Sequence, residues 1–254
     1  MLIEKRQVRT RYSSLGRLLR RLVRVLRPIS KSPDYSDTAD ICAVRLVPEQ
    51  ALTEVYRKAL RILGASARDG AYVEFGVFNG TSLACMSAAA ASSNVQPFPM
   101  IGIDSFEGLP SEVSNEDGGV WTPGQFACSR DETLRCLSAK RVLPSSYSLI
   151  NTWYHDLEPS TLDEHLKGRR IAILMIDCDA YSSAKRALDL AGPLLAERAV
   201  IFFDDWRLND LDLKEGGEYR AFNEWRSINS QVRIDSFPRY NRKSEAFVLN
   251  TTQR

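Results

Sequence analysis

Apolar residues recur along the chain at two alternating spacings, and this alternation predicts an α/β fold. From Pro48 to Leu63 the spacing is helical, with apolar side chains at Leu52, Val55, Tyr56, Ala59, Leu60 and Leu63. Gly70 then opens a short apolar run at 71–75 (AYVEF), which is typical of a buried strand. The Ala-rich segment 81–93 predicts the next helix.

The same alternation continues to the C-terminus. Further strands are predicted at 100–103, 147–150, 171–176 and 199–203, and further helices at 130–141, 160–167, 182–196 and 216–228. Two last apolar runs, 232–237 and 245–249, flank a polar turn and predict a terminal hairpin. We therefore expect a doubly wound, mostly parallel sheet with helices on both faces and an antiparallel pair at one edge.

The first 40 residues differ from the rest of the chain. Residues 15–26 (LGRLLRRLVRVL) predict a basic amphipathic helix that ends near Pro28, and residues 30–40 are typical of a linker. The helix would dock on the chain's own body or on a second subunit of a homo-oligomer, or residues 15–27 would contact an anionic membrane surface. An organelle transit peptide is a further alternative. We expect an arm and linker at 1–40 and one α/β domain at 41–254.

The net charge of +2 conceals a division between these two parts. Residues 1–31 hold ten basic residues and one acidic residue, a net +9, so the remainder carries −7. Because the basic residues gather in the arm and the body is acidic, nucleic acid is not an expected partner. No apolar run is long enough for a membrane span, so we expect a cytoplasmic protein, with membrane association through the arm as the alternative.

The five cysteines, at positions 42, 85, 128, 136 and 178, form no C-x-x-C pair. An odd number of scattered cysteines is not typical of a disulfide framework or of a thiolate zinc site. We therefore expect no disulfide framework, which is consistent with a reducing cytoplasm.

A glycine motif follows the first predicted strand. It runs from Glu74 through Gly76 and Gly80 to Thr81 and Ser82, where a helix begins. Glycines allow sharp turns and a close ligand, and a helix start offers free N–H groups. The spacing differs from the G-x-G-x-x-G of NAD-binding turns, and an acid before the glycines suits a ligand with an ammonium group. Close packing of strand and helix is the alternative role.

The second predicted strand ends in Asp104, followed by Ser105 and Phe106. A carboxylate at this position can accept hydrogen bonds from both hydroxyls of a ribose. A helix cap or turn aspartate is the alternative.

Three aspartates follow the fourth and fifth predicted strands: Asp177, Asp204 and Asp205. Neighbouring parallel strands lie about 4.8 Å apart, so these carboxylates would converge at one edge of the sheet. Carboxylates in such proximity repel one another unless a cation lies among them, and oxygen ligands favour Mg²⁺ or Mn²⁺ over zinc. Asp179 would support this group or cap the next helix. Separate capping or ion-paired aspartates are the alternative.

Four segments together resemble the macrocin O-methyltransferase family of bacterial sugar-modifying enzymes. They are YVEFGVFNGTS, GIDSFEGLP, IDCDAYSSAKRAL and AVIFFDDW, and the resemblance covers about residues 45–250 in matching order. It implies a Rossmann-like class I methyltransferase fold, S-adenosylmethionine as methyl donor, Mg²⁺ or Mn²⁺ dependence, and a small-molecule or glycan acceptor with hydroxyl groups.

The resemblance also implies residue roles. Glu74, Gly76, Gly80, Thr81 and Ser82 would lie beside the methionine part of the cofactor. Asp104 would hold the ribose, with Ser105 and Phe106 in the adenosine wall. Asp177, Asp204 and Asp205 would bind the metal, and Asp177 and Asp205 are the candidate catalytic residues.

The sequence departs from this family at two positions. Ala180 stands where leucine is usual, and the family's histidine after the Asp204–Asp205 pair is missing, since His155 and His165 both precede it. Asp204, Asp205, Lys214 or Glu218 would then accept the proton. A non-catalytic cofactor-binding scaffold and a metal-dependent hydrolase or phosphotransferase remain alternative functions. The long segments 107–128 and 206–219, which contain Trp121, Phe126, Trp206 and Tyr219, would form a lid or a sugar-binding wall, or only pack as loops.

Overall fold

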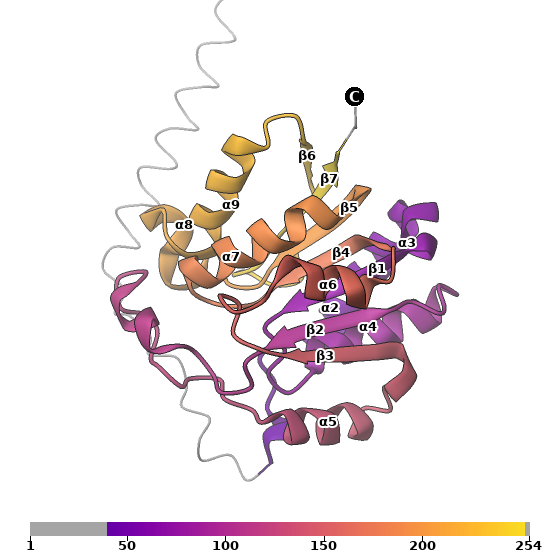
Figure 1. The fold of residues 1–254 in the computed structure, drawn as a ribbon, viewed down its shortest axis with the longest axis horizontal. Coiled ribbons are helices and arrows are strands. Elements are labelled where there is room, and N and C mark those ends of the chain that lie inside the picture. Colours follow the sequence, from indigo (N-terminus) through magenta and orange to yellow (C-terminus); the bar gives the residue numbers. More distant parts are fainter. Residues whose placement is uncertain (1–39, 252–254) are drawn as a thin grey trace, which may run out of the picture. The chain divides into compact units, whose positions relative to one another are not determined.

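The computed structural model describes residues 40–251, which form a seven-stranded sheet between two layers of helices (Figure 1). The strand order is β3-β2-β1-β4-β5-β7-β6. The first five strands pair in parallel, and β7 pairs antiparallel with both β5 and β6. The predicted doubly wound sheet with an antiparallel edge is confirmed.

The strands lie where the apolar runs predicted them. They are β1 (Gly70–Phe75), β2 (Met100–Asp104), β3 (Tyr147–Asn151), β4 (Arg170–Ile176), β5 (Leu195–Phe203), β6 (Arg233–Ser236) and β7 (Glu245–Asn250). Successive residues of a strand face opposite layers: Tyr72 packs into one core and Val73 into the other. Both faces of β1 and β4 are covered, which explains their continuous apolar sequences.

The helices divide between the two faces of the sheet. One layer holds α2 (Glu49–Leu63), α3 (Ala65–Asp69) and α4 (Thr81–Ser92), and the opposite layer holds α6 (Pro159–Leu166), α7 (Tyr181–Ala191) and α9 (Gly217–Ile228) (Figure 1). The helix α5 (Arg130–Ala139) precedes β3, and the short α8 (Leu211–Lys214) precedes α9. Because the crossover connections make these five strands parallel, their carboxyl ends all lie at the same edge of the sheet.

Two local differences from the predicted elements have clear causes. The helix predicted at 182–196 ends at Ala191, because Gly192 and Pro193 follow, and β5 already begins at Leu195. The helices α3 and α8 were not predicted, since five and four residues are too short to show a helical period.

The cysteines were expected to form no disulfide framework, and this expectation did not foresee one disulfide that the structure shows. Cys42 and Cys136 form a disulfide across a sequence separation of 94, joining the 3-10 helix η1 (Ile41–Ala43) to α5. An ion pair of 3.4 Å between Asp40 and Arg135 lies beside it. Spacing along the sequence gave no sign of this pair, because only the fold brings the two residues together.

The predicted basic arm, at 1–40 with its helix at 15–26, lies outside the described residues except for Asp40. Within residues 40–251, none of the helices has both the length and the apolar character that crossing a membrane requires.

Candidate active site

The glycine motif forms a tight turn between β1 and α4. Gly76 has φ +92°, and a Cβ atom there would lie 1.7 Å from the backbone oxygen of Asp177. Gly80 is the N-cap of α4 with φ +74°, and a Cβ atom there would lie 2.6 Å from a methyl carbon of Leu137. Both positions require glycine, and the free N–H groups at the start of α4 face the region beyond the strand ends.

Glu74 lies fully buried beneath this turn. Tyr72 donates a hydrogen bond of 2.7 Å to one carboxyl oxygen, and the Ser82 hydroxyl donates to the other. Burial raises the pKa of Glu74 to about 8, although the hydrogen bonds from Ser82 and Tyr72 oppose the rise. Glu74 therefore fixes the first turn of α4 through Ser82.

Asn79 links the turn to the segment before α2. Its side-chain amide donates to the backbone oxygens of Ile41 and Val44 at 3.0 and 3.1 Å, and its oxygen accepts a 2.7 Å bond from Thr81. Sequence reasoning missed Asn79, because a single asparagine in a glycine-containing turn is common. The hydroxyl of Thr81 is thus engaged in holding Asn79.

Asp104 supports the same turn from β2. One carboxyl oxygen accepts N–H bonds from Val77 and Phe78 at 2.7 and 3.0 Å, and the other accepts from Phe106 at 2.7 Å. Most of its acceptor positions are therefore engaged with backbone. Burial raises the pKa of Asp104, and the backbone hydrogen bonds to its carboxylate oppose that rise.

The residues after Asp104 form a compact turn. Ser105 is buried, with its hydroxyl donating to the backbone oxygen of Gly108, and Asn151 of β3 donates to the Ser105 backbone oxygen at 2.8 Å. Phe106 is buried with φ +61°. The rings of Phe78 and Phe126 are both half-buried and form an edge-to-face pair with centroids 6.3 Å apart.

Asp177, Asp204 and Asp205 meet at the ends of β4 and β5, as predicted. The pairing of Ile176 with Phe203 places them side by side, and one carboxyl oxygen from each lies within 4.8 Å of the others. Asp204 and Asp205 are 2% exposed. An all-oxygen set at this separation fits a hard divalent cation such as Mg²⁺ or Mn²⁺.

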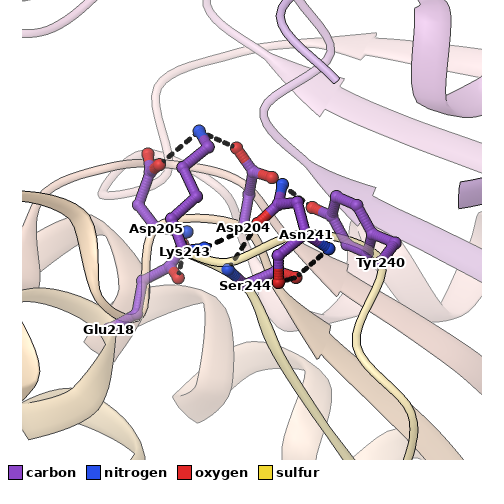
Figure 2. Close-up of polar contacts among 7 residues, drawn as sticks. All are labelled: Asp204, Asp205, Glu218, Tyr240, Asn241, Lys243 and Ser244. Carbon is purple, nitrogen blue, oxygen red and sulfur yellow. Dashed lines mark hydrogen bonds and ion pairs between the residues drawn. The ribbon is translucent and has the colours of Figure 1, made fainter. Parts of the chain in front are cut away.

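Lys243, from the turn between β6 and β7, lies at this cluster and was missed from the sequence. Its ammonium nitrogen is 2.5 Å from an oxygen of Asp204 and 2.7 Å from an oxygen of Asp205, as Figure 2 shows. Tyr240, in the same turn, donates its hydroxyl to the other oxygen of Asp204. No sequence period marks these residues, because antiparallel pairing of β7 with β5 brings them to the strand ends.

The cluster holds more carboxyl groups than cationic groups among the described residues. Asp179 and Glu218 are also buried there, and the Asp205 N–H donates to Glu218 at 2.9 Å. Burial, and then the neighbouring Asp204 and Asp205, raise the pKa of Asp177. Burial alone would lower the pKa of Lys243, but the carboxylates outweigh it and hold that pKa well above its usual value. In the described part of the chain, one oxygen of Glu218 lacks a hydrogen-bond partner. A surplus of carboxyl groups over cations and a free acceptor oxygen both fit an added cation.

The other candidate proton acceptors lie differently. Lys214 is exposed at the end of α8, whereas Glu218 is buried against the Asp205 backbone. The two histidines, which were not candidates for this role, lie elsewhere: the His155 side chain is 72% exposed beside Asp156, and the His165 ring bonds the Thr161 backbone oxygen within α6. Among these, the structure brings Glu218 to the aspartate cluster.

The two long loops, 107–128 and 206–219, contact each other near the starts of α7 and α9. Asp117 accepts N–H bonds from Tyr181 at 3.0 Å and from Gly217 at 2.6 Å, so the loop after β2 is fastened to the starts of both helices. Trp121 is buried with Val113 and Leu211, and Trp206 is buried against Phe203 and Phe222. Trp121 thus packs in a small core between the loops, whereas Trp206 packs in the main core beside β5 and α9.

An open α/β sheet of this topology, with a glycine turn after β1 and acidic residues after β2, β4 and β5, defines a Rossmann-like protein of the class I methyltransferase type. The chain belongs to the family described as Methyltransferase domain, whose model matches residues 73–206. No curated protein matches the chain.

Solved structures of O-methyltransferases share the fold. NovP, described as an O-methyltransferase, is 19% identical, with 80% of each chain covered and a TM-score of 0.60. The calicheamicin methyltransferase CalS11 is 18% identical over 87% of this chain and all of its own, with a TM-score of 0.56, and a second structure describes it as a TDP-rhamnose 3'-O-methyltransferase. An O-methyltransferase from Bacillus cereus in complex with SAH is 13% identical over 83% of this chain and 84% of its own, with a TM-score of 0.55.

Proposed function

We propose that this protein transfers a methyl group from S-adenosylmethionine to a hydroxyl of a sugar on a glycan, glycolipid or secondary metabolite, assisted by Mg²⁺ or Mn²⁺, as in the macrocin O-methyltransferase family. The observation that carries the proposal is the aspartate cluster lying directly against the glycine turn through Gly76. The sugar methyltransferase described for CalS11 supports the acceptor class.

The cofactor would lie at the turn between β1 and α4. Gly76 and Gly80 allow close approach to the backbone, and the start of α4 at Thr81 and Ser82 offers N–H donors to the methionine carboxylate. Glu74 is fully buried and engaged with Tyr72 and Ser82, so it acts on the ammonium end of the cofactor by holding this turn.

The adenosine part would lie along β2. Asp104 keeps part of its acceptor capacity beyond its backbone bonds, and with it accepts a hydrogen bond from the ribose. Ser105 and Phe106 form the adjoining wall.

The acceptor hydroxyl would lie at the cluster, where Asp177, Asp204 and Asp205 would hold the metal. A divalent cation bound there would lower the pKa of a coordinated hydroxyl. Asp177 and Asp205 orient that hydroxyl and take its proton, while the glycine turn holds the methyl donor for an in-line displacement. Alignment of donor and acceptor supplies much of the rate enhancement, because the sulfonium is already activated.

The decisive experiment measures S-adenosylhomocysteine formation with a panel of nucleotide-activated sugars that begins with TDP-rhamnose. We expect product with a mass gain of 14 in Mg²⁺, none in EDTA, and S-adenosylmethionine binding that EDTA leaves unchanged. Asp205→Asn should lower turnover by at least about 100-fold, a loss of about 2.7 kcal/mol in transition-state stabilisation. Full activity of Asp205→Asn in EDTA would contradict the metal mechanism. Binding of ATP in place of S-adenosylmethionine would favour a hydrolase or phosphotransferase.

The proposal also covers where the protein acts and what its basic N-terminal arm does. We propose a cytoplasmic enzyme whose basic residues 15–27 bring it to an anionic membrane surface or to a second subunit, near a glycolipid acceptor. Co-sedimentation of the full chain with anionic vesicles, compared with neutral vesicles, tests the membrane alternative, and sedimentation velocity without vesicles tests the homo-oligomer.

A further inference from the structure

Lys243 touches two of the three carboxylates that a metal would need. Its ammonium lies 2.5 Å from Asp204 and 2.7 Å from Asp205 (Figure 2), and both of these side chains are almost completely buried. These short charge-assisted hydrogen bonds occupy carboxyl oxygens of Asp204 and Asp205. A divalent ion bound by the same two residues would need those oxygens as ligands. The ammonium and a divalent ion therefore compete for these carboxylates.

The backbone that presents Lys243 is fixed, while its side chain is partly free. Asn241 accepts N–H bonds from Lys243 at 2.8 Å and from Ser244 at 2.7 Å, which closes the turn before β7 (Figure 2). Pairing of Glu245 with Phe203 sets this turn beside Asp204. The Lys243 side chain is 31% exposed and its stem is flexible, so the ammonium has a route to solvent.

Carboxyl groups outnumber cations at the cluster. Within the described residues, five buried or partly buried carboxyl groups (Asp177, Asp179, Asp204, Asp205 and Glu218) gather near the one ammonium of Lys243, which contacts two of them. A compact ammonium offers three donors and one charge, whereas Mg²⁺ offers two charges and directional coordination to oxygen. Two cations held by the same carboxylates would repel each other, so binding of one weakens binding of the other.

We propose that Lys243 is an internal cation that holds Asp204 and Asp205 of the three-aspartate site together without metal and is displaced when a divalent ion binds. This inference rests on the metal site of the proposed function. It makes metal binding an exchange, in which Asp204 and Asp205 release the ammonium to solvent as they take the ion. The carboxylates thus stay together and oriented before metal arrives, and the competing ammonium lowers the apparent metal affinity.

The first test is Mn²⁺ affinity, measured by electron paramagnetic resonance on the full chain without cofactor or acceptor. Lys243→Met removes the ammonium and keeps most of the apolar stem, and Lys185→Met is the matched control, since Lys185 pairs only with the i+4 residue Asp189 in the described structure. We expect Lys243→Met to bind Mn²⁺ at least about 10-fold more tightly than the wild type, and Lys185→Met to match the wild type. Equal or weaker binding by Lys243→Met would overturn the inference.

A second test uses the wild-type chain and so does not depend on folding of the variant. Limited acetylation of lysines with an activated ester, read by mass spectrometry, reports how free each ammonium is. We expect saturating Mg²⁺ to raise labelling of Lys243 several-fold and to leave labelling of Lys185 unchanged. Labelling of Lys243 that does not respond to Mg²⁺, in protein shown to bind Mn²⁺, would overturn the inference.

The two tests separate this inference from the proposed function. If wild type and Lys243→Met bind Mn²⁺ equally, the displacement is wrong and the metal site stands. If neither binds Mn²⁺ while S-adenosylmethionine still binds, the metal site is wrong, and the displacement falls with it.

Discussion

Gly76 lies so close to the backbone oxygen of Asp177 that a Cβ atom at position 76 would be 1.7 Å from it. This contact joins the turn after β1 to the end of β4, because the two strands are paired neighbours in the sheet. The proposed cofactor turn and the aspartate cluster are therefore held in register by backbone packing, without a side chain between them.

Gly76→Ala should disrupt both halves of the site. The new methyl group would clash with the Asp177 backbone, and φ +92° is unfavourable for any residue with a Cβ atom. We expect a loss of several kcal/mol in the free energy of unfolding and loss of S-adenosylmethionine binding, measured by urea denaturation and calorimetry.

Gly118→Ala is the matched control for this change. Gly118 also has a positive φ, +75°, but no described atom lies within 4 Å of a Cβ atom placed there. The substitution should cost about 1 kcal/mol from backbone strain alone and leave cofactor binding unchanged. If the two alanine variants lost equal stability, the contact between Gly76 and Asp177 would not be the cause.

Glu74 should make stability fall as pH rises. Its carboxyl titrates at about 8 in the fold and near 4.5 in the unfolded chain, so between these values the unfolded state binds fewer protons. The free energy of unfolding then decreases by up to about 1.4 kcal/mol per pH unit from about pH 4.5 to 8 and levels off above. Glu74→Gln removes this contribution, so the difference between wild type and variant should slope across that window.

Urea midpoints at pH 5 to 9 measure the slope, and other buried carboxyl groups cancel in the difference. Glu197→Gln, at an exposed position of β5, is the control for replacing a glutamate at the surface. A flat difference between wild type and Glu74→Gln would mean that Glu74 stays ionised in the fold.

Features set by local sequence could be predicted, whereas features set by long-range pairing could not. The apolar runs gave the strands, and Asp177, Asp204 and Asp205 converge because they directly follow two neighbouring parallel strands. Lys243 lies 38 residues after Asp205 and reaches the cluster because β7 pairs antiparallel with β5. No periodicity in the sequence indicates this pairing.

Contacts that only the fold creates also explain why the roles of Asp104 and Glu74 were predicted only in part. Asp104 lies at the predicted strand end, yet three of its acceptor positions serve the backbone of the adjoining turn. Glu74 follows the predicted pattern but is fully buried, because Tyr72 and Ser82 close over it. Residue type and spacing located these carboxyl groups, and their hydrogen-bond partners required the fold.

The disulfide between Cys42 and Cys136 should contribute to stability. It closes a loop with a sequence separation of 94, and cross-links of this length typically stabilise by about 2–5 kcal/mol. We expect Cys42→Ser to lower the free energy of unfolding by that amount in oxidising buffer. Dithiothreitol should bring the wild type close to the variant and leave the variant unchanged. An equal response of both proteins to dithiothreitol would show that the bond does not form.

Asp117 should hold the loop after β2 against the starts of α7 and α9. Its carboxylate accepts N–H bonds from Tyr181 and Gly217, which start α7 and α9, and hydrogen bonds to a charged group contribute about 1.5–3 kcal/mol each. Asp117→Ala should speed hydrogen exchange of amides in 107–128 by at least about 10-fold and raise the acceptor KM, with little change in S-adenosylmethionine affinity.

Two further variants serve as controls for this prediction. Asp117→Asn keeps one acceptor oxygen and tolerates the φ of +49°, so its exchange rate should lie between those of the wild type and Asp117→Ala. Glu112→Ala, at an exposed position of the same loop, should exchange like the wild type. Uniform exchange across all three variants would mean that packing around Trp121, rather than Asp117, fixes the loop.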